Sequence, residues 1–339
     1  MKAIKVIKPG NIQITEEEIP KILDPHVVVV KIKAAGICGS DISIFKGTSP
    51  VATYPRVIGH EFAGEVVEIG SAVTRVQAGD HVSINPVIGC GECRVCKKGR
   101  SNVCAAMTVV GVHMDGGFRE YAVMPENNVF KVSNDISWEQ AAIIEPYTVA
   151  AQAVSRGNVQ ADDTILILGC GPNALTILQV AKMIGAKCIM SDIVAGRLKR
   201  AKEFGADIVI NSLEEDVEQK IRELTSSAGV DVAIDAACAG TTLEQAIACT
   251  RPAGTVVTMG FSDKPSNIRE LDITKKELDV KGTRLNNGKF PQVIEWVESG
   301  CIDSSKIITD TFCFTDIDKA FDKIKNDPEH VLKVILKFD

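Results

Sequence analysis

The sequence has few aromatic residues and no tract of basic residues. Phe, Trp and Tyr make up 5% of the 339 residues, which argues against a broad stacking surface for sugars or nucleic-acid bases. Lys and Arg number 38 against 44 Asp and Glu, so the formal net charge is −6. A mildly acidic chain of this kind is a poor match for nucleic acid or an anionic membrane surface, and we expect neither as a partner.

The sequence also lacks a long uninterrupted apolar segment. The longest apolar region, residues 164–181, is broken by glycine, proline and asparagine between positions 169 and 173. The N-terminal residues MKAIKVIKPG do not contain the apolar core of a signal peptide. We therefore expect no membrane span and a cytoplasmic location, where thiols stay reduced. The eleven cysteines are then better explained as metal ligands or small buried residues than as disulfides.

Length and patterning predict two domains. A chain of 339 residues exceeds the roughly 250–300 residues at which a single core stops growing. The first ~145 residues form short β-like runs bounded by Gly, Asp or Pro. An Ala-rich helical segment follows at residues 138–154, in which Pro146 either starts or kinks one part. The last ~50 residues should rejoin the first domain, because a tail of that size buries too little surface alone.

From residue 163 onward, short apolar runs alternate with helical segments. The expected strands are residues 164–169, 187–192, 207–211, 231–237, 254–260 and 277–283. The expected helices between them are residues 174–185, 195–205, 213–227 and 241–250. This alternation predicts a doubly wound parallel sheet with helices on both faces, so the fold class is α/β combined with a β-rich domain.

Four cysteines within fifteen residues give the sharpest local signal: Cys90, Cys93, Cys96 and Cys104. Four thiolates close a tetrahedral shell around one Zn²⁺, and the run contains no histidine and implies no open position, so it indicates a structural site. An iron–sulfur cluster also uses the C-x2-C-x2-C pattern. Its fourth cysteine normally follows after three residues and precedes proline, whereas Cys104 follows after seven and precedes Ala105.

A second signal combines Cys38 with the neighbouring His60 and Glu61. Together these side chains are a plausible mixed ligand set for zinc. Glu145 is a candidate partner from the junction between the two regions. The alternatives are an ordinary hydrogen-bonded histidine and a glutamate favoured at a helix N-terminus by the macrodipole.

The third signal is a glycine-rich turn between an expected strand and helix. Its residues are Gly169, Cys170, Gly171, Pro172, Asn173 and Ala174. This pattern is typical of dinucleotide-binding units, in which the glycines permit a tight turn and a close approach of the pyrophosphate to the helix N-terminus. Asp192 ends the next expected strand, where a carboxylate accepts hydrogen bonds from both adenosine ribose hydroxyls and repels the 2′-phosphate of NADP. We therefore expect NAD as the cofactor; the alternative for Asp192 is a turn residue at a strand end.

Together these motifs resemble the zinc-containing medium-chain dehydrogenases, the group of sorbitol and threonine dehydrogenases. The GHE segment, the four cysteines and the glycine-rich turn occur in the family's order, and the resemblance covers nearly the whole chain. It implies a GroES-like catalytic domain of residues 1–146 and 286–339, interrupted by a Rossmann domain of residues 147–285, with the active site in the cleft between them. It also implies a homodimer or homotetramer.

Motif matching extends the resemblance to single residues. Cys38, His60 and Glu145 correspond to the ligands of a catalytic zinc, and Glu61 to the neighbouring acid that binds or releases the metal. The four clustered cysteines correspond to the structural site, which implies two zinc ions per chain. The resemblance further implies that Ser40 passes the substrate proton towards the cofactor ribose. The residues that it implies for cofactor binding are Gly169, Gly171, Pro172, Asn173, Ala174, Asp192 and Arg197.

Several stretches resemble bacterial sugar-acid dehydrogenases of the L-gulonate and L-galactonate 5-dehydrogenase kind, a group that includes starvation-sensing dehydrogenases. They are YPRVIGHEF, GVHMDGGFREYAV, IEPYTVAA, IDAAC, MGFS and TRLNNGKFP. The expected reaction is hydride transfer from a secondary alcohol of a hexonate to NAD. A polyol or threonine dehydrogenase, a zinc-free quinone reductase and a non-catalytic NAD-responsive regulator are the alternatives; the metal-ligand set argues against the last two.

The segment around Arg284 follows the last expected strand and is the candidate substrate contact. Arg284 has a planar fork suited to a carboxylate, and Asn286 and Asn287 are candidates for binding hydroxyls. The alternative is an ion-paired arginine and turn-forming asparagines. Two positions depart from the family pattern. Ser43 stands where many relatives have histidine, which leaves water as the proton relay, and Asn173 replaces an aliphatic residue.

Overall fold

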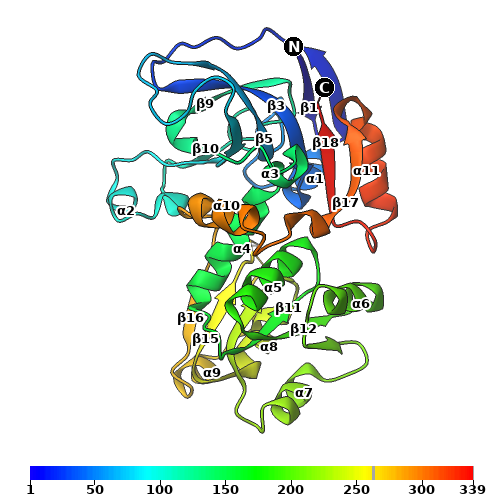
Figure 1. The fold of residues 1–339 in the computed structure, drawn as a ribbon. Helices are drawn as coiled ribbons and strands as arrows, with labels where there is room; N and C mark the ends of the chain where they lie inside the picture. The colour runs from blue at the N-terminus through cyan, green and yellow to red at the C-terminus, as the bar shows by residue number, and fades with distance from the viewer. Residues whose placement is uncertain (262–263, 339) are drawn as a thin grey trace. The chain divides into compact units, whose positions relative to one another are not determined.

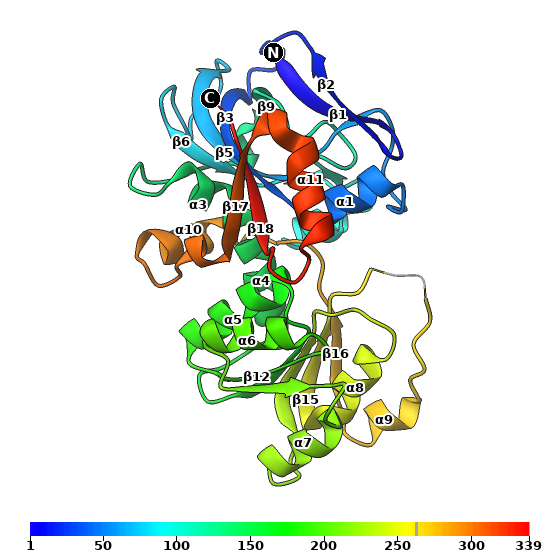
Figure 2. The same ribbon diagram turned by 90° about the vertical axis from the view of Figure 1, so that its right-hand side faces the viewer.

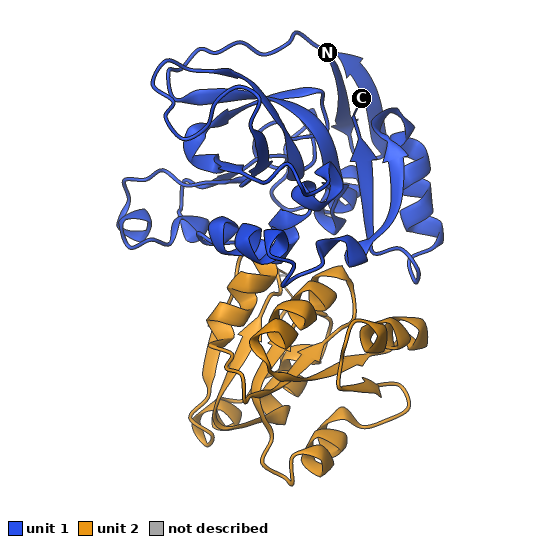
Figure 3. Ribbon diagram, viewed as in Figure 1, with its two compact units in different colours: residues 1–148, 286–339 blue, residues 149–285 orange. Residues whose placement is uncertain are grey.

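A computed structural model describes residues 1–261 and 264–338, and these residues divide into two compact units (Figure 3). Unit 1 comprises Met1–Thr148 and Asn286–Asp339, and unit 2 comprises Val149–Leu285. The chain therefore leaves unit 1 once and returns to it once. Helix α4 (Ile144–Gly157) contains the first crossing, and the Leu285–Asn286 bond is the second.

Unit 2 is built on a parallel six-stranded sheet in the order β13-β12-β11-β14-β15-β16. The strands are β11 (Thr164–Leu168), β12 (Lys187–Asp192), β13 (Ile208–Asn211), β14 (Val230–Asp235), β15 (Thr250–Thr258) and β16 (Asp279–Gly282). The apolar run of β11 pairs with β12 on one side and β14 on the other, so it is buried, as its composition predicts. The strand order reverses between β11 and β14, and in doubly wound sheets ligands bind at the carboxyl ends of the strands beside this point.

Helices cover both faces of this sheet, which confirms the doubly wound prediction. They are α5 (Pro172–Ile184), α6 (Ala195–Glu203), α7 (Val217–Leu224), α8 (Thr242–Cys249) and α9 (Glu270–Thr274). Helices α5 and α6 lie on one face, and α7 and α8 on the other (Figure 2). The prediction that α7 starts at residue 213 was wrong. Asn211 holds residues 213–215 in a turn, and Asp216 then caps the helix by accepting the backbone N–H of Gln219.

Unit 1 is β-rich, and its largest sheet contains seven strands. Six follow the order β10-β6-β5-β3-β18-β17, and β9 also pairs with β3. These strands are β3 (Val27–Ile37), β5 (Glu61–Ile69), β6 (His81–Ile84), β9 (Tyr121–Pro125), β10 (Val129–Lys131), β17 (Ile308–Cys313) and β18 (Lys333–Lys337). Strand β18, from the last segment of the chain, lies against β3 from the first (Figure 1). The C-terminal residues therefore complete a sheet that the N-terminal residues begin.

Short elements surround that sheet. They are β1 (Lys2–Lys8), β2 (Asn11–Glu16), β4 (Arg56–Val57), β7 (Val87–Ile88), β8 (Thr108–Val109), α1 (Gly39–Lys46), α2 (Arg94–Lys97), α3 (Trp138–Ala142), α10 (Phe290–Glu298) and α11 (Ile317–Asn326). The predicted helix at residues 138–154 is two helices, α3 and α4, and Pro146 stands in the first turn of α4, where its missing N–H is tolerated. Within the described ranges, no helix combines the length and the apolar character that crossing a membrane requires.

Candidate active site

Two adjacent strands bring Cys38, His60 and Glu61 together. Cys38 follows the end of β3, Glu61 is the first residue of β5, and His60 immediately precedes that strand. The strands are antiparallel and Gly36 pairs with Glu61, so the end of one strand meets the beginning of the other. Ligand atoms of the three side chains all lie within 4.8 Å of one another.

The donor chemistry of this group fits a zinc ion. Thiolate, imidazole and carboxylate are the zinc ligands found in proteins. Glu61 Oε2 is buried and finds no hydrogen-bond partner among the described residues, whereas His60 Nδ1 faces the Asp41 carboxylate. Gly36 leaves room for the group, because a Cβ at that position would overlap the Glu61 carboxylate. Buried polar atoms without partners are costly unless a cation or a donor satisfies them, and a metal ion would do so here.

Glu145, the remaining predicted ligand, belongs to the same buried cluster but lies outside the closest group. It stands in the first turn of α4 with 3% of its surface exposed. The pKa of the Glu145 carboxyl is raised to about 7, chiefly by burial; the His60 charge opposes this rise and the Glu61 charge adds to it. Glu145 is therefore close enough to His60 and Glu61 for their charges to affect it. The carboxylate that lies beside Cys38 and His60 is that of Glu61, not that of Glu145.

Asp41 is a site residue that sequence reasoning missed. It is fully buried in α1 and accepts the backbone N–H groups of Cys38 at 2.8 Å and Gly59 at 3.0 Å. Its Oδ1 also lies 3.7 Å from His60 Nδ1. Burial acts to lower the pKa of His60, but the negative charges of Asp41 and Cys38 outweigh it and raise that pKa well above its usual value. A carboxylate behind a histidine commonly orients the ring for metal binding. The one available signal was the Cys-x2-Asp spacing.

Lys333 is the second residue that sequence reasoning missed. It is the first residue of β18, and its ammonium pairs with Glu61 Oε1 although both side chains are buried. Burial acts to lower the pKa of Lys333, but the Glu61 carboxylate outweighs this and raises the pKa above its usual range. The lysine and the glutamate are 272 positions apart, so no local pattern links them.

Ser40 lies beside the same group. Its hydroxyl is 3.5 Å from His60 Nε2, and the residue is exposed at the start of α1. A hydroxyl in this position can exchange protons with solvent. Ser43, one turn further along α1, donates its hydroxyl to the Gly39 carbonyl and is therefore occupied within the helix.

The four clustered cysteines converge on one point in what we call the cysteine lobe, residues 90–104. The Sγ–Sγ distances are 3.9 Å for Cys90–Cys96, 3.8 Å for Cys93–Cys104 and 3.5 Å for Cys104–Cys90. A tetrahedral shell with Zn–S bonds of about 2.3 Å places sulfur atoms about 3.8 Å apart. The lobe therefore has the dimensions of a closed zinc site, with no position left for a substrate.

Backbone hydrogen bonds favour the deprotonated, metal-binding form of two thiols in the cysteine lobe. The N–H of Cys93 donates to Cys90 Sγ and the N–H of Cys96 donates to Cys93 Sγ, each at 3.4 Å. These bonds favour the thiolate form, and the first of them is the main reason why the pKa of Cys90 falls to about 6. The thiolate is the form that binds a metal.

In unit 2, the glycine-rich turn joins β11 to α5. Gly169 has a φ of 96°, which favours glycine, and a Cβ there would lie 3.1 Å from the backbone of Ala237. Gly171 precedes α5 and has open space where a Cβ would be, and Pro172 is the first helical residue. Asn173 and Ala174 follow in the first turn of α5, the former accepting the Thr176 hydroxyl through its carbonyl. The N–H groups at this helix N-terminus suit a phosphate.

Asp192 ends β12 beside that turn. Its two carboxylate oxygens accept the backbone N–H groups of Cys170 at 2.7 Å and Val194 at 2.9 Å. These bonds fix the carboxylate while each oxygen keeps a lone pair for a ribose hydroxyl. Arg197 lies on α6, near enough for its charge to lower the pKa of Cys170, although burial raises that pKa overall.

The segment predicted to contact the substrate divides between the two units. In unit 2, exposed Arg284 stacks over the Phe261 ring at 5.0 Å. In unit 1, Asn286 is 1% exposed and donates its amide to Asn85 Oδ1 at 3.2 Å. Asn286 Oδ1 is buried without a hydrogen-bond partner among the described residues, and the contact between Asn286 and substrate hydroxyls stays a prediction. Asn287 donates to the Gly99 carbonyl at 2.7 Å and so ties the chain to the cysteine lobe.

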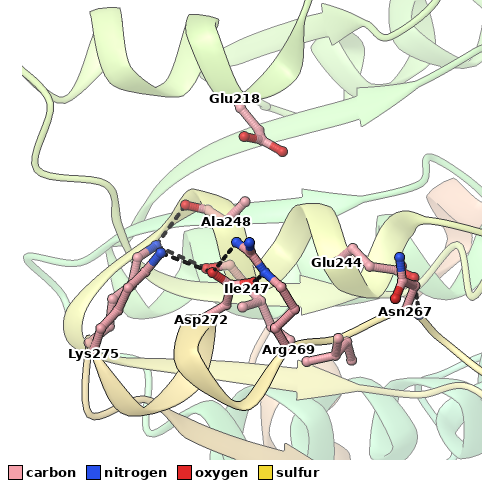
Figure 4. A pocket seen from close by; sticks show the side chains of 10 residues that line it. Glu218, Glu244, Ile247, Ala248, Asn267, Arg269, Asp272 and Lys275 are labelled. Carbon is pink, nitrogen blue, oxygen red and sulfur yellow. Dashed lines mark hydrogen bonds and ion pairs between the residues drawn. The ribbon is translucent and has the colours of Figure 1, made fainter.

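A cavity of about 430 Å³ also opens in unit 2, between α7, α8 and α9 (Figure 4). Its charged side chains largely satisfy one another. Asp272 accepts hydrogen bonds from Arg269 and Lys275, and the Lys276 ammonium donates to three backbone carbonyls at the end of α8. None of the predicted cofactor residues lines it. We therefore assign it no part in the candidate site.

Comparison with known proteins identifies the family. Residues 24–134 match the alcohol dehydrogenase GroES-like domain, and residues 174–299 match the zinc-binding dehydrogenase family. The starvation-sensing protein RspB of Escherichia coli K12 is 42% identical over the whole of this chain and 99% of its own length. The chain belongs to the zinc-containing medium-chain dehydrogenases. Members of this family oxidise CH–OH donors with a nicotinamide dinucleotide, so the predicted class of enzyme and its use of zinc and a nicotinamide cofactor are confirmed. The preference for NAD over NADP stays a prediction.

Two further relatives are informative about this dehydrogenase. A crystal structure of the alcohol dehydrogenase rspB from Escherichia coli CFT073, in complex with NADH, superposes with a TM-score of 0.95, is 42% identical, and covers 100% of this chain and 99% of the other. The L-idonate 5-dehydrogenase of Vitis vinifera is 34% identical over 88% of this chain and 85% of its own.

Proposed function

We propose that this dehydrogenase oxidises a secondary hydroxyl of a hexonate-type sugar acid with NAD. The observation that carries the reaction is the convergence of half-buried Cys38 with buried His60 and Glu61, with Glu145 in the same cluster. The sugar-acid substrate is supported by the L-idonate 5-dehydrogenase relative and by the exposed Arg284 at the carboxyl edge of the unit 2 sheet.

In this proposal Cys38, His60 and Glu145 hold a catalytic zinc, and Glu61 is the neighbouring acid. When bound, zinc supplies the Lewis acidity that lowers the pKa of the substrate hydroxyl, and the nicotinamide accepts the hydride. The cysteine lobe holds a second zinc that serves the fold alone. The His60 ring must be neutral to bind a metal, so metal binding there releases the proton that Asp41 and Cys38 favour.

The other residues of the site position groups and move protons. Asp41 fixes the backbone of Cys38 and faces the His60 ring. The Ser40 hydroxyl takes the proton that leaves the substrate oxygen and passes it to solvent, a role that suits its exposure. With Ser43 bonded inside α1, water completes the relay. Asp192, fixed by two backbone N–H groups, binds the ribose hydroxyls of NAD.

The decisive experiment is a screen of NAD reduction. Hexonates, including L-gulonate, L-galactonate and L-idonate, are compared with sorbitol, xylitol, threonine and short alcohols at equal concentration. We expect the highest kcat/KM with a hexonate. A higher value with a polyol or threonine would reject the sugar acid but keep the dehydrogenase. Binding of NAD without turnover of any alcohol would favour a regulatory protein.

Asp192→Asn should weaken NAD binding by roughly tenfold to a hundredfold. The substitution removes the charge that strengthens the ribose hydrogen bonds, and such bonds contribute about 1.5–3 kcal/mol. It also removes the repulsion of a 2′-phosphate, so the ratio of NAD to NADP affinity should fall. Both affinities can be measured by calorimetry. Asp207→Asn, on the loop that leads into β13, is the control. A wild-type protein that prefers NADP would contradict the role of Asp192.

Arg284→Ala should lower kcat/KM for the acid, with a loss of transition-state stabilisation of about 2–4 kcal/mol. Its activity on a polyol should be nearly unchanged. The guanidinium, exposed in the free protein, is proposed to hold the substrate carboxylate in the bound complex. Loss of one partner of a charge pair that binding desolvates has this magnitude. Arg222→Ala is the matched control, because Arg222 is an exposed arginine of the same unit that pairs with Glu218 on α7. Equal losses on acid and polyol would mean that Arg284 supports the fold rather than the substrate.

We also propose a homodimer or homotetramer. Among the strands of residues 149–261 and 264–285, β16 ends the sheet and pairs with β15 alone, so its outer edge is an unpaired ladder. Val280 on this strand is 40% exposed and lies between Asp279 and Lys281. Antiparallel pairing of two copies about Val280 sets each Asp279 opposite the other copy's Lys281.

A further inference from the structure

The Glu61–Lys333 pair is an unusual feature of the site, because it buries two opposite charges beside a proposed metal ion. Their side chains are 1% and 3% exposed. Burying an ion pair is seldom worth its desolvation for stability alone, whereas removing one partner leaves an uncompensated charge. A functional role would therefore explain why this ion pair is buried.

Strand register explains how the two side chains meet. Gly36 of β3 pairs with Glu61 of β5 on one side and with Ile335 of β18 on the other. Side chains that face one another across a sheet, or stand two residues apart on a strand, share a face. Lys333 and Glu61 thus lie on the face of Gly36. Because Gly36 has no side chain, the lysine reaches across β3 to the glutamate.

The two oxygens of Glu61 have different surroundings. Oε1 accepts the Lys333 ammonium, whereas Oε2 is buried without a hydrogen-bond partner among the described residues. The carboxylate also lies within 4.8 Å of the ligand atoms of Cys38 and His60. One carboxylate is therefore placed between a fixed ammonium and the proposed metal, and the two cations compete for it.

We propose that Lys333 is a positioning residue that holds Glu61 back from the metal, so that the open coordination position stays available to the substrate. This inference rests on the proposed catalytic site. The positive charge of Lys333 withdraws electron density from Glu61, and Glu61 binds the metal fully only when its bond to Lys333 weakens. Without the lysine, Glu61 stays bound to the metal. The metal is then released more slowly, and kcat falls because Glu61 occupies the position that the substrate needs.

The test is the rate at which a chromogenic chelator removes the catalytic zinc. In Lys333→Met we expect release slower by about tenfold or more and kcat lower by a similar factor, the usual range for residues that orient metal ligands. The absorption spectrum of the Co²⁺-substituted protein should shift towards higher coordination. Lys333→Arg, which keeps the charge, should behave like the wild type. Lys337→Met is the matched control, because Lys337 stands on the same strand in an exposed pair with Glu139.

A double-mutant cycle isolates the role of Glu61. In the Glu61→Gln background, Lys333→Met should change zinc release less than twofold, because no carboxylate remains to be held. An equal effect of Lys333→Met in both backgrounds would show that the lysine charge acts on the metal directly and not through Glu61. Unchanged zinc release in Lys333→Met would show that Lys333 has a structural role only. Either result overturns the proposal. If Lys333→Met does not fold, Lys333→Gln replaces it with the same expectation. A wild-type protein with one zinc per chain would instead reject the catalytic site itself.

Discussion

Replacing Cys38 with serine should remove one of two zinc ions and almost all activity. A serine hydroxyl stays protonated near neutral pH, so it does not replace the thiolate as a ligand or offset the charge of the ion. Metal-ion catalysis contributes several kcal/mol, and its loss should lower kcat/KM on the order of a thousandfold. Elemental analysis and steady-state NAD reduction measure the two effects.

The fold should survive this change, because an open site contributes less to stability than a closed one. Brief chelator treatment of the wild type should likewise abolish activity before it unfolds the protein. Cys301→Ser is the control, since Cys301 is an exposed cysteine of the same unit. A Cys38→Ser variant that keeps two zinc ions and its activity would mean that Cys38 is not a ligand.

Cys104→Ala should have the opposite profile, with a large loss of stability. Cys104 is the buried member of the cysteine lobe, and its sulfur lies within 3.8 Å of those of Cys90 and Cys93. A structural zinc binds the folded state and not the unfolded chain, so its loss should lower the unfolding free energy by about 4 kcal/mol when free zinc is about a thousandfold above its Kd. For a unit of this size that corresponds to a fall in Tm of roughly 8–16 °C.

Calorimetry and zinc content test this prediction together. The variant should keep the catalytic zinc, and its activity at low temperature should fall far less than that of Cys38→Ser. Cys313→Ala, at an exposed cysteine, should leave Tm within a degree or two. Recovery of iron instead of zinc, or an unchanged Tm, would contradict the assignment of the lobe.

The sequence allowed unit 2 to be predicted well because its elements are local. Strands such as β11 are buried on both faces, so their apolar composition shows directly, and the turn before α5 needs glycine for its backbone. The start of α7 was misplaced because the side chain of Asn211 holds a turn that helix propensity alone does not indicate. The proposed zinc ligands of the cysteine lobe could be recognised because all four cysteines fall within fifteen residues.

The remainder of the site depends on pairing between distant strands. The Glu61–Lys333 contact arises because β18 joins β3, and one residue of register would move Lys333 to the other face. Asn286 illustrates the same limit in reverse. A polar residue after a strand predicts an exposed turn, yet tertiary packing buries this one against Asn85. Composition and spacing do not report which polar residues the fold buries.

The interrupted order of the chain affects its synthesis. Residues 149–285 of unit 2 are continuous, so this unit can fold while the ribosome is still translating later codons. Unit 1 cannot complete its main sheet at that stage, because β17 and β18 belong to this sheet and are made after unit 2. Until β18 is made, the last residues of β3, Ala34–Ile37, lack a partner strand on one edge, and Glu61 has no ammonium to neutralise it in a nascent chain that already contains Cys38 and His60. Premature metal capture and strand mispairing are therefore hazards confined to the unfinished polypeptide, and both end when β18 closes the sheet.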